Sequence, residues 1–121
     1  MKRIMTIDDS PSLRQMVALT LEGAGFEVVE ACDGQDAVAK LVAHEEFHLF
    51  LTDLNMPGMD GIELTRKLRS MPDYRFVPII LLTTESQQEK KMQGKAAGAT
   101  GWIVKPFQPQ DLLATVKKVM R

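Results

Sequence analysis

The sequence predicts an α/β fold: a doubly wound parallel sheet of five strands, built from five βα units in series. Short segments rich in Ile, Val, Leu and Met alternate with longer segments whose apolar residues recur every three or four positions. Some of the short segments are apolar on both faces, which is typical of parallel strands covered on two sides. The length of 121 residues suits one domain with a single core, so we expect residues 1–121 to form a single domain without an output domain.

The first unit is a strand over residues 2–8 followed by a helix. Ser10 is suited to cap this helix, Pro11 suits its first turn, and Gly25 is suited to end it. Its apolar face consists of Leu13, Met16, Val17, Leu21 and Ala24. A second strand over residues 26–31 should follow this helix.

The middle of the chain continues the same alternation. Asp33-Gly34 predicts a turn into a helix over about residues 35–45. The side chains expected to face inward are Ala37, Val38, Leu41 and Val42. Residues 47–52 are expected to form the third strand. A third helix follows, with an apolar face of Leu64, Leu68 and Met71.

The last two units follow the same pattern. Residues 78–83 predict the fourth strand, residues 85–97 a polar helix, and residues 101–104 a short fifth strand. The final helix has an apolar stripe of Leu112, Leu113, Val116, Val119 and Met120. Because crossovers between parallel strands are right-handed, the helices should cover both faces of the sheet.

Reactive side chains follow several of these strands. Ligands bind to such sheets at the carboxyl ends of the strands, where the strand order reverses. The residues at those ends are Asp8 and Asp9, then Asp53, then Thr83 and Thr84, and finally Lys105. Each has an ordinary structural explanation by itself, as a helix cap, a turn residue or a surface charge. Their common position at one edge of the sheet favours a functional site.

Three carboxylates at one edge predict a metal site. If the first and third strands are neighbours, Asp8, Asp9 and Asp53 repel one another, which raises one pKa unless a cation neutralises the charge. Oxygen ligands without His or Cys favour Mg²⁺ over Zn²⁺. An Asp carboxylate can accept a phosphoryl group, and the Lys105 ammonium and Thr83 hydroxyl are suited to stabilise its oxygens.

These motifs resemble those of two-component response-regulator receiver domains, and the resemblance covers essentially the whole chain. The motifs are Asp8-Asp9, T-D-L-N-M-P-G-M-D-G at 52–61, L-L-T-T-E at 81–85 and W-I-V-K-P-F at 102–107. The stand-alone chemotaxis receivers of the CheY type are the most similar group. The resemblance, and not the periodicity, implies the strand order 2-1-3-4-5 of the flavodoxin-like CheY fold.

The resemblance also implies a role for each residue at the site. Asp53 would accept a phosphoryl group from a histidine kinase, in a reaction that depends on Mg²⁺. Asp9 would bind the ion directly and Asp8 mainly through water, with the backbone carbonyl of Asn55 as a further ligand. Thr83 and Lys105 would contact the phosphoryl group. The bond between Lys105 and Pro106 is expected to be cis.

Three further positions concern the conformational change that phosphorylation causes in the family and the lifetime of the phosphoryl group. The residue three positions before Lys105 is most often Tyr or Phe in the family, and here it is Trp102. We expect Trp102 to turn inward when Thr83 moves toward the phosphoryl group; the alternative is a partly buried core aromatic. Asn55 and Glu85 border the path of the attacking water in the family and tune dephosphorylation. Glu85 equally suits the first turn of a helix.

The surface formed by the fourth helix, the fifth strand and the fifth helix is the family's usual output face. It carries Lys90, Lys91, Lys95, Lys117 and Lys118. The expected partners are a CheA-like histidine kinase, a flagellar motor switch protein of the FliM type that offers an acidic amphipathic segment, and a phosphatase. The alternative is that these lysines are simply solvated. The lysines lack interleaved aromatic residues for base stacking, so nucleic acid is not an expected partner.

Composition limits the remaining possibilities. The net charge of −1 gives no general attraction to nucleic acid or to an anionic membrane. Cys32 is the only cysteine, which excludes an internal disulfide and a metal site built on several cysteines, and fits a reducing compartment. Apolar runs fall far short of the roughly 20 residues needed to span a bilayer. We expect a soluble, cytoplasmic monomer that does not act as an enzyme on separate substrates.

Three alternative functions share parts of this pattern. The first is a receiver in another phosphorelay, as a phosphate carrier, sink or adaptor, and no residue excludes it. The second is a phosphatase of the haloacid dehalogenase type, which places its nucleophile in a D-x-D motif after the first strand, whereas Asp8 and Asp9 are adjacent. The third is a flavodoxin-like FMN carrier, disfavoured because Asp8-Asp9-Ser10-Pro11 presents two negative charges where a phosphate would bind.

Overall fold

The computed structural model describes residues 1–43, 46–84 and 89–120. The strands are β1 Arg3–Ile7, β2 Glu27–Ala31, β3 Leu49–Asp53, β4 Ile79–Thr84 and β5 Gly101–Lys105. The helices are α1 Pro11–Gly23, α2 Gly34–Leu41, α3 Gly61–Arg69, α4 Lys90–Ala97 and α5 Pro109–Val119, and a short 3₁₀ helix, η1, spans Pro72–Tyr74. Strands and helices alternate along the described chain as the sequence predicts.

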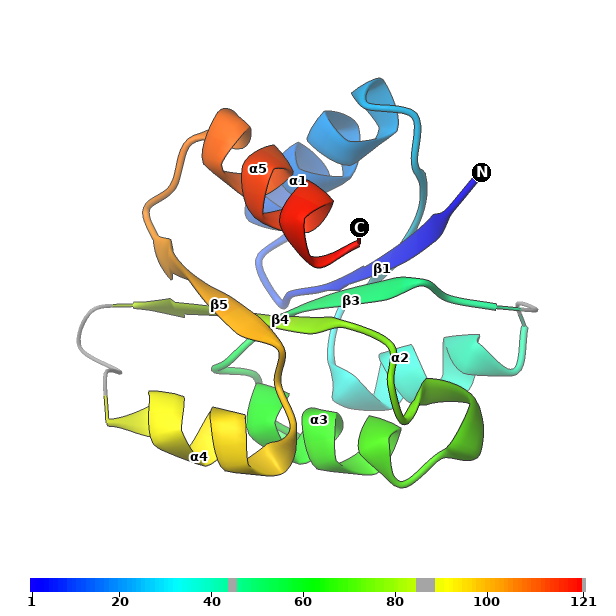
Figure 1. Cartoon of the computed structure of the whole chain (residues 1–121), viewed down its shortest axis with the longest axis vertical. Coiled ribbons are helices and arrows are strands. Elements are labelled where there is room, and N and C mark those ends of the chain that lie inside the picture. Colours follow the sequence, from blue (N-terminus) through cyan, green and yellow to red (C-terminus); the bar gives the residue numbers. More distant parts are fainter. Residues whose placement is uncertain (44–45, 85–88, 121) are drawn as a thin grey trace.

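The five strands form one parallel sheet in the order β2-β1-β3-β4-β5, which confirms the expected fold. Helices α1 and α5 cover one face, and α2, α3 and α4 cover the other (Figure 1). The chain leaves β1 toward one edge and then returns past it to β3, so the strand order reverses between β1 and β3. Among the described helices, none is long and apolar enough to cross a membrane.

Two apolar layers hold the helices to the sheet. The layer under α1 and α5 is built around Ile4, Val17, Leu21, Leu49, Leu51, Ile80, Leu82, Leu112 and Val116. The layer on the opposite face is built around Met5, Ile7, Phe47, Phe50, Leu64, Leu68, Tyr74 and Ile79. Alternate residues of β1 and β3 enter opposite layers because successive side chains of a strand point to opposite faces. Both central strands are therefore almost fully buried, which makes their carboxyl ends rigid points of attachment for a site.

Local signals at both ends of α1 work as the sequence predicts. The Ser10 hydroxyl accepts a hydrogen bond from the Leu13 N–H at 3.4 Å, and Pro11 is the first helical residue. At the other end, the Phe26 N–H donates to the Leu21 carbonyl and the Gly25 N–H donates to the Glu22 carbonyl. This pair of bonds requires the left-handed backbone of Gly25, whose φ is 96°.

The structure corrects several predicted boundaries. The first strand is Arg3–Ile7, so Asp8 follows it. The third strand is Leu49–Asp53, so Asp53 is its last residue. Phe47 precedes that strand, yet it is buried and stacks near Phe50 with 5.6 Å between ring centroids, which explains its apolar character.

Several helices also differ from the prediction. Helix α3 ends at Arg69, so Met71, which was expected on its apolar face, follows it and precedes η1. Helix α2 ends at Leu41, earlier than expected, and Val42 is 90% exposed, which corrects the inward position assigned to it. Val42 and Ala43 form a turn after the helix, and the expected residues 44–45 lie outside the described residues. Helix α4 begins at Lys90; the expected residues 85–88 lie outside the described residues.

Gly61 lies in unusually close contact with the backbone beside Asp53. Asp60 caps α3 by accepting from the Glu63 N–H at 2.8 Å, and the Gly61 N–H donates to the Leu54 carbonyl at 2.9 Å. A Cβ atom on Gly61 would stand 2.5 Å from the Asp53 carbonyl oxygen. The glycine therefore allows α3 to start directly against the end of β3.

Replacing Gly61 by Ala should destabilise the protein, because the new methyl group meets backbone atoms that cannot move aside cheaply. We expect a loss of about 1–3 kcal/mol in the free energy of unfolding, measured by urea denaturation. Gly23→Ala is the matched control, because nothing lies within 4 Å of a Cβ there. The control should be neutral or stabilising by up to about 1 kcal/mol. Equal stability of the two variants would contradict the proposed close contact.

Candidate functional site

The register of the sheet brings the reactive residues to one edge. Ile7 of β1 lies opposite Thr52 of β3, so Asp8 and Asp53 follow at the same level. The hydrogen bonding continues past the strands, since the Asp8 N–H donates to the Ala31 carbonyl at 3.1 Å. On the other side of β3, Thr84 of β4 lies opposite Lys105. Parallel pairing therefore converts four distant sequence motifs into one site.

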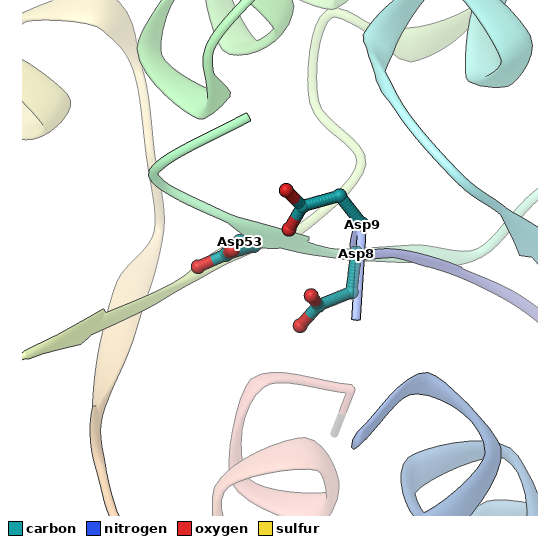
Figure 2. A group of neighbouring side chains, drawn as sticks. All are labelled: Asp8, Asp9 and Asp53. Atoms are coloured by element: carbon teal, nitrogen blue, oxygen red, sulfur yellow. The ribbon is translucent and has the colours of Figure 1, made fainter. Parts of the chain in front are cut away.

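The carboxylates of Asp8, Asp9 and Asp53 form the centre of this edge. One oxygen from each lies within 4.8 Å of the others. Figure 2 shows Asp8 and Asp9 on either side of the end of β1, with Asp53 beside them at the end of β3. Asp8 is 1% exposed and Asp53 is 7% exposed, whereas Asp9 lies open to solvent. The predicted crowding of three carboxylates is thus observed.

Lys105 supplies positive charge to this cluster. Its Nζ atom lies 2.9 Å from Oδ1 of Asp53 and 3.7 Å from Oδ2 of Asp8. The side chain reaches the cluster from β5, two strands away from β3, and crosses over the end of β4. The peptide bond that follows, Lys105-Pro106, is cis as expected. The Lys105 ammonium thus pairs with two of the three carboxylates, and its single charge leaves the three acids with an excess of negative charge.

The environment of Asp8 fits a metal ligand. Its Oδ1 atom accepts a hydrogen bond from the Ser10 N–H at 2.9 Å. Its Oδ2 atom is buried and has no hydrogen-bond partner among the described residues. Burial raises the pKa of the Asp8 carboxyl above its ordinary value; the Ser10 N–H and the Lys105 ammonium oppose that shift, and Asp53 and Asp9 add to it. Burial is the largest cause, so the predicted repulsion between carboxylates is real but secondary.

The donor set therefore suits a hard divalent cation. Carboxylate oxygens at the open edge of a sheet match the preference of Mg²⁺, which takes one or two carboxylates and keeps several waters. A hollow of about 390 Å³ beside Asp9 gives room for those waters. It is lined by Asp9, Asn55, Met56, Pro57, Gly58, Asp60 and Glu63. Asn55 thus lies beside Asp9, although its expected role as a carbonyl ligand stays a prediction.

Thr83 and Trp102 share the face of the sheet covered by α3 and α4. Thr83 is 2% exposed, and its hydroxyl has no hydrogen-bond partner among the described residues. Trp102 is half-buried and lies away from the carboxylates, packed against Leu54, Ile62 and Leu81. Its packing agrees with the alternative of a partly buried core aromatic and does not test the predicted rotation. Glu85 lies outside the described residues.

Arg14 is a site residue that the sequence analysis missed. Its Nη1 atom donates to the Asp8 carbonyl oxygen at 2.7 Å, and its Nε atom donates to Glu30 at 3.1 Å. The contact fixes the backbone that carries Asp8 and Asp9. Its position in the first turn of α1, four residues after Ser10, was the available signal, but an arginine there is ordinarily a solvated helix residue.

The raised pKa of Asp8 predicts a pH-dependent stability for the metal-free protein. Because the folded state binds the Asp8 proton more tightly than the unfolded state, its stability contribution falls as pH rises above about 3.8 and through the raised pKa. Asp8→Asn removes the buried charge and should stabilise the protein at pH 7 in EDTA. Urea denaturation at pH 4 and pH 7 measures the difference, which should be smaller at pH 4.

Added Mg²⁺ should reverse the order of stability, because it stabilises the wild type by binding a ligand set that the variant has lost. Asp9→Asn is the control for charge alone, since Asp9 is exposed and its replacement should change stability less in EDTA. A wild type more stable than Asp8→Asn at pH 7 in EDTA would contradict the desolvation of Asp8.

Comparisons with known proteins agree with this geometry. The family model of the response regulator receiver domain matches residues 4–117. The structure superposes on that of the Vibrio cholerae chemotaxis protein CheY4 with a TM-score of 0.93 and 49% identity, over 98% of each chain. The chemotaxis protein CheY1 of Helicobacter pylori is 37% identical over 119 residues, which cover 98% of this chain and 96% of CheY1.

A second kind of relative is longer. The phosphate regulon transcriptional regulatory protein PhoB of Pseudomonas aeruginosa is 41% identical over 120 residues. That match covers 99% of this chain but 52% of PhoB, so the chain spans about half the length of that relative. The family match, the superposition on CheY4 and the acidic edge of the sheet lead to one conclusion: the chain belongs to the response regulator receiver domains of two-component systems.

Proposed function

We propose that this receiver domain is a phosphorylation-driven switch in which Asp53 accepts a phosphoryl group from a histidine kinase. The observation that carries the proposal is the placement of Asp53 between two further carboxylates and the Lys105 ammonium, at 2.9 Å from the latter. An Asp in that position has a nucleophilic oxygen at the open edge of the sheet. It also has a cation ready for the oxygens of an incoming phosphoryl group.

The chemistry is a displacement at phosphorus. An oxygen of Asp53 forms a bond to the phosphorus atom while the bond from phosphorus to the histidine nitrogen breaks, and that nitrogen keeps the electron pair. Asp8, Asp9, Asp53 and the Asn55 carbonyl would hold Mg²⁺, and the ion would neutralise charge on the phosphoryl oxygens. The Lys105 ammonium moves from Asp53 to a phosphoryl oxygen, and the Thr83 hydroxyl donates to another. Later attack by water at phosphorus regenerates Asp53, with Asn55 and Glu85 bordering its path.

The buried Thr83 hydroxyl supports a mechanical consequence of phosphorylation. Because its oxygen has no hydrogen-bond partner among the described residues, a new acceptor at Asp53 would give it one. Movement of Thr83 toward that acceptor frees space on the face where Trp102 packs. We propose that Trp102 turns into this space and changes the surface that a partner protein reads.

That surface is the groove between α4 and α5. It is a hollow of about 460 Å³ lined by Lys95, Ala99, Thr100, Gly101, Trp102, Thr115, Lys118 and Val119. Its lysines suit an acidic segment and its apolar floor suits a helix with one apolar face. Since CheY1 and CheY4 are chemotaxis proteins that this chain matches along nearly their whole length, we propose a flagellar motor switch protein of the FliM type as the partner and a CheA-like kinase as the donor.

The acceptor role of Asp53 is tested by phosphoryl transfer from a histidine kinase carrying labelled phosphate. Asp53→Asn should abolish labelling while the protein stays folded, because the amide has the shape of the carboxylate but is not a nucleophile. Asp73→Asn, an exposed acid on η1, is the control and should be labelled like the wild type. Labelling of the wild type should also stop in EDTA. Continued labelling of Asp53→Asn would contradict the assignment.

The output is tested with an acidic amphipathic segment of a motor switch protein, labelled for fluorescence anisotropy. With Mg²⁺ and beryllofluoride, which imitates the phosphorylated state, we expect the dissociation constant to fall at least about tenfold. Lys118→Glu should weaken binding at least about threefold, whereas Lys67→Glu, exposed on α3 and outside the groove, should not. An equal dissociation constant with and without beryllofluoride would contradict the chemotaxis proposal and favour a carrier, sink or adaptor in another phosphorelay.

A further inference from the structure

The Lys91 ammonium lies over the indole ring of Trp102. The distance from Nζ to the ring centroid is 5.2 Å, within the range of an attractive cation–π contact. Lys91 belongs to the first turn of α4 and Trp102 to β5, so the contact joins two elements of the output surface. Trp102 is the only tryptophan in the chain, which makes the contact open to direct observation by fluorescence.

The indole stands on the same face of the sheet as Thr83. Leu81 of β4 lies opposite Trp102, and Thr83, two residues further along β4, lies opposite Val104. Residues two apart on a strand share a face, so Leu81 and Thr83 both point toward the layer that holds Trp102. The ring therefore packs against Leu81 of β4 on one side and meets the Lys91 ammonium on another.

Helix energetics alone do not explain a lysine at this point of α4. Lys90 and Lys91 both stand in the first turn, where the positive end of the helix dipole disfavours cations. Within α4 the buried residue is Gly94, where an added Cβ would stand 2.6 Å from Leu81 Cδ1, so the helix contacts the sheet closely but with little side-chain area. The contact between Lys91 and Trp102 adds a side-chain link between the start of α4 and β5.

We propose that Lys91 is a positioning residue that holds the Trp102 ring in its resting orientation and so opposes the switch. This inference rests on the proposed function. A contact present in the resting state and lost in the active state favours the resting state by its own strength. For a cation–π contact at a partly exposed site, that strength corresponds to a change of about two- to fivefold in the switching equilibrium. An acidic partner that draws the ammonium away would release the ring as it binds.

The test compares three variants with the wild type. Lys91→Met removes the charge but keeps an unbranched chain of similar length, and Lys91→Arg keeps a cation able to stand over the ring. Lys90→Met removes the neighbouring charge and is the matched control. Acrylamide quenching of Trp102 fluorescence in EDTA reports the resting orientation. A beryllofluoride titration in Mg²⁺, followed by the rise in the thermal unfolding midpoint, reports activation without relying on Trp102.

Lys91→Met should change the quenching constant and lower the half-saturating beryllofluoride concentration about two- to fivefold. Lys91→Arg and Lys90→Met should both resemble the wild type. The proposal requires that the wild type responds to beryllofluoride. It is then overturned if Lys91→Met has the same half-saturating beryllofluoride concentration as the wild type, or if Lys90→Met lowers that concentration as much as Lys91→Met does. A wild type without any response to beryllofluoride would instead contradict the proposed function, and the inference with it.

Discussion

The burial of carboxylate charge at one edge of the sheet is the constraint on which this site depends, and repulsion among the three carboxylates adds to it. The oxygens of Asp8, Asp9 and Asp53 lie within 4.8 Å of one another, and Asp8 and Asp53 are nearly inaccessible to water. Such an arrangement is unfavourable without a compensating cation. Lys105 offsets part of the charge, and a divalent ion would offset the rest. Because the surrounding strands are buried on both faces, they hold the carboxylates together instead of letting them separate.

In the proposed switch, the same rigidity would carry a local change at the site to the protein surface. Replacing the pair between Asp53 and Lys105 by contacts to a phosphoryl group would change which buried polar groups have hydrogen-bond partners. Thr83 is the described neighbour whose hydroxyl would gain a partner by that change. Because Thr83 and Leu81, which packs against Trp102, lie on one face of β4, the proposed path runs through these side chains to the groove between α4 and α5. Lys91 stands at the outer side of that path.

Contacts to the backbone at the ends of β1 and β3 hold the reactive carboxylates in place. Gly61 lets α3 start against the Asp53 carbonyl, and Arg14 holds the Asp8 carbonyl from α1. These two contacts come from opposite faces of the sheet, one toward each acidic strand end. Neither residue carries chemistry of its own. Their effect is to fix the backbone from which the reactive carboxylates project.

The sequence by itself determined the order of the elements and the parallel sheet. It also determined that Asp8, Asp53, Thr83 and Lys105 lie at one edge. It could do so because the spacing of apolar residues and the ends of the strands are local properties of the chain. Its errors were local too: the apolar Val42 was expected to face inward from the second helix, whereas this helix ends at Leu41 and Val42 is exposed. Only the tertiary structure decided the pairing of Lys105 with Asp53, which are 52 residues apart, the burial that raises the Asp8 pKa, and the position of Lys91 over Trp102. These features depend on distances through space and on exclusion of water, which no pattern along the chain records.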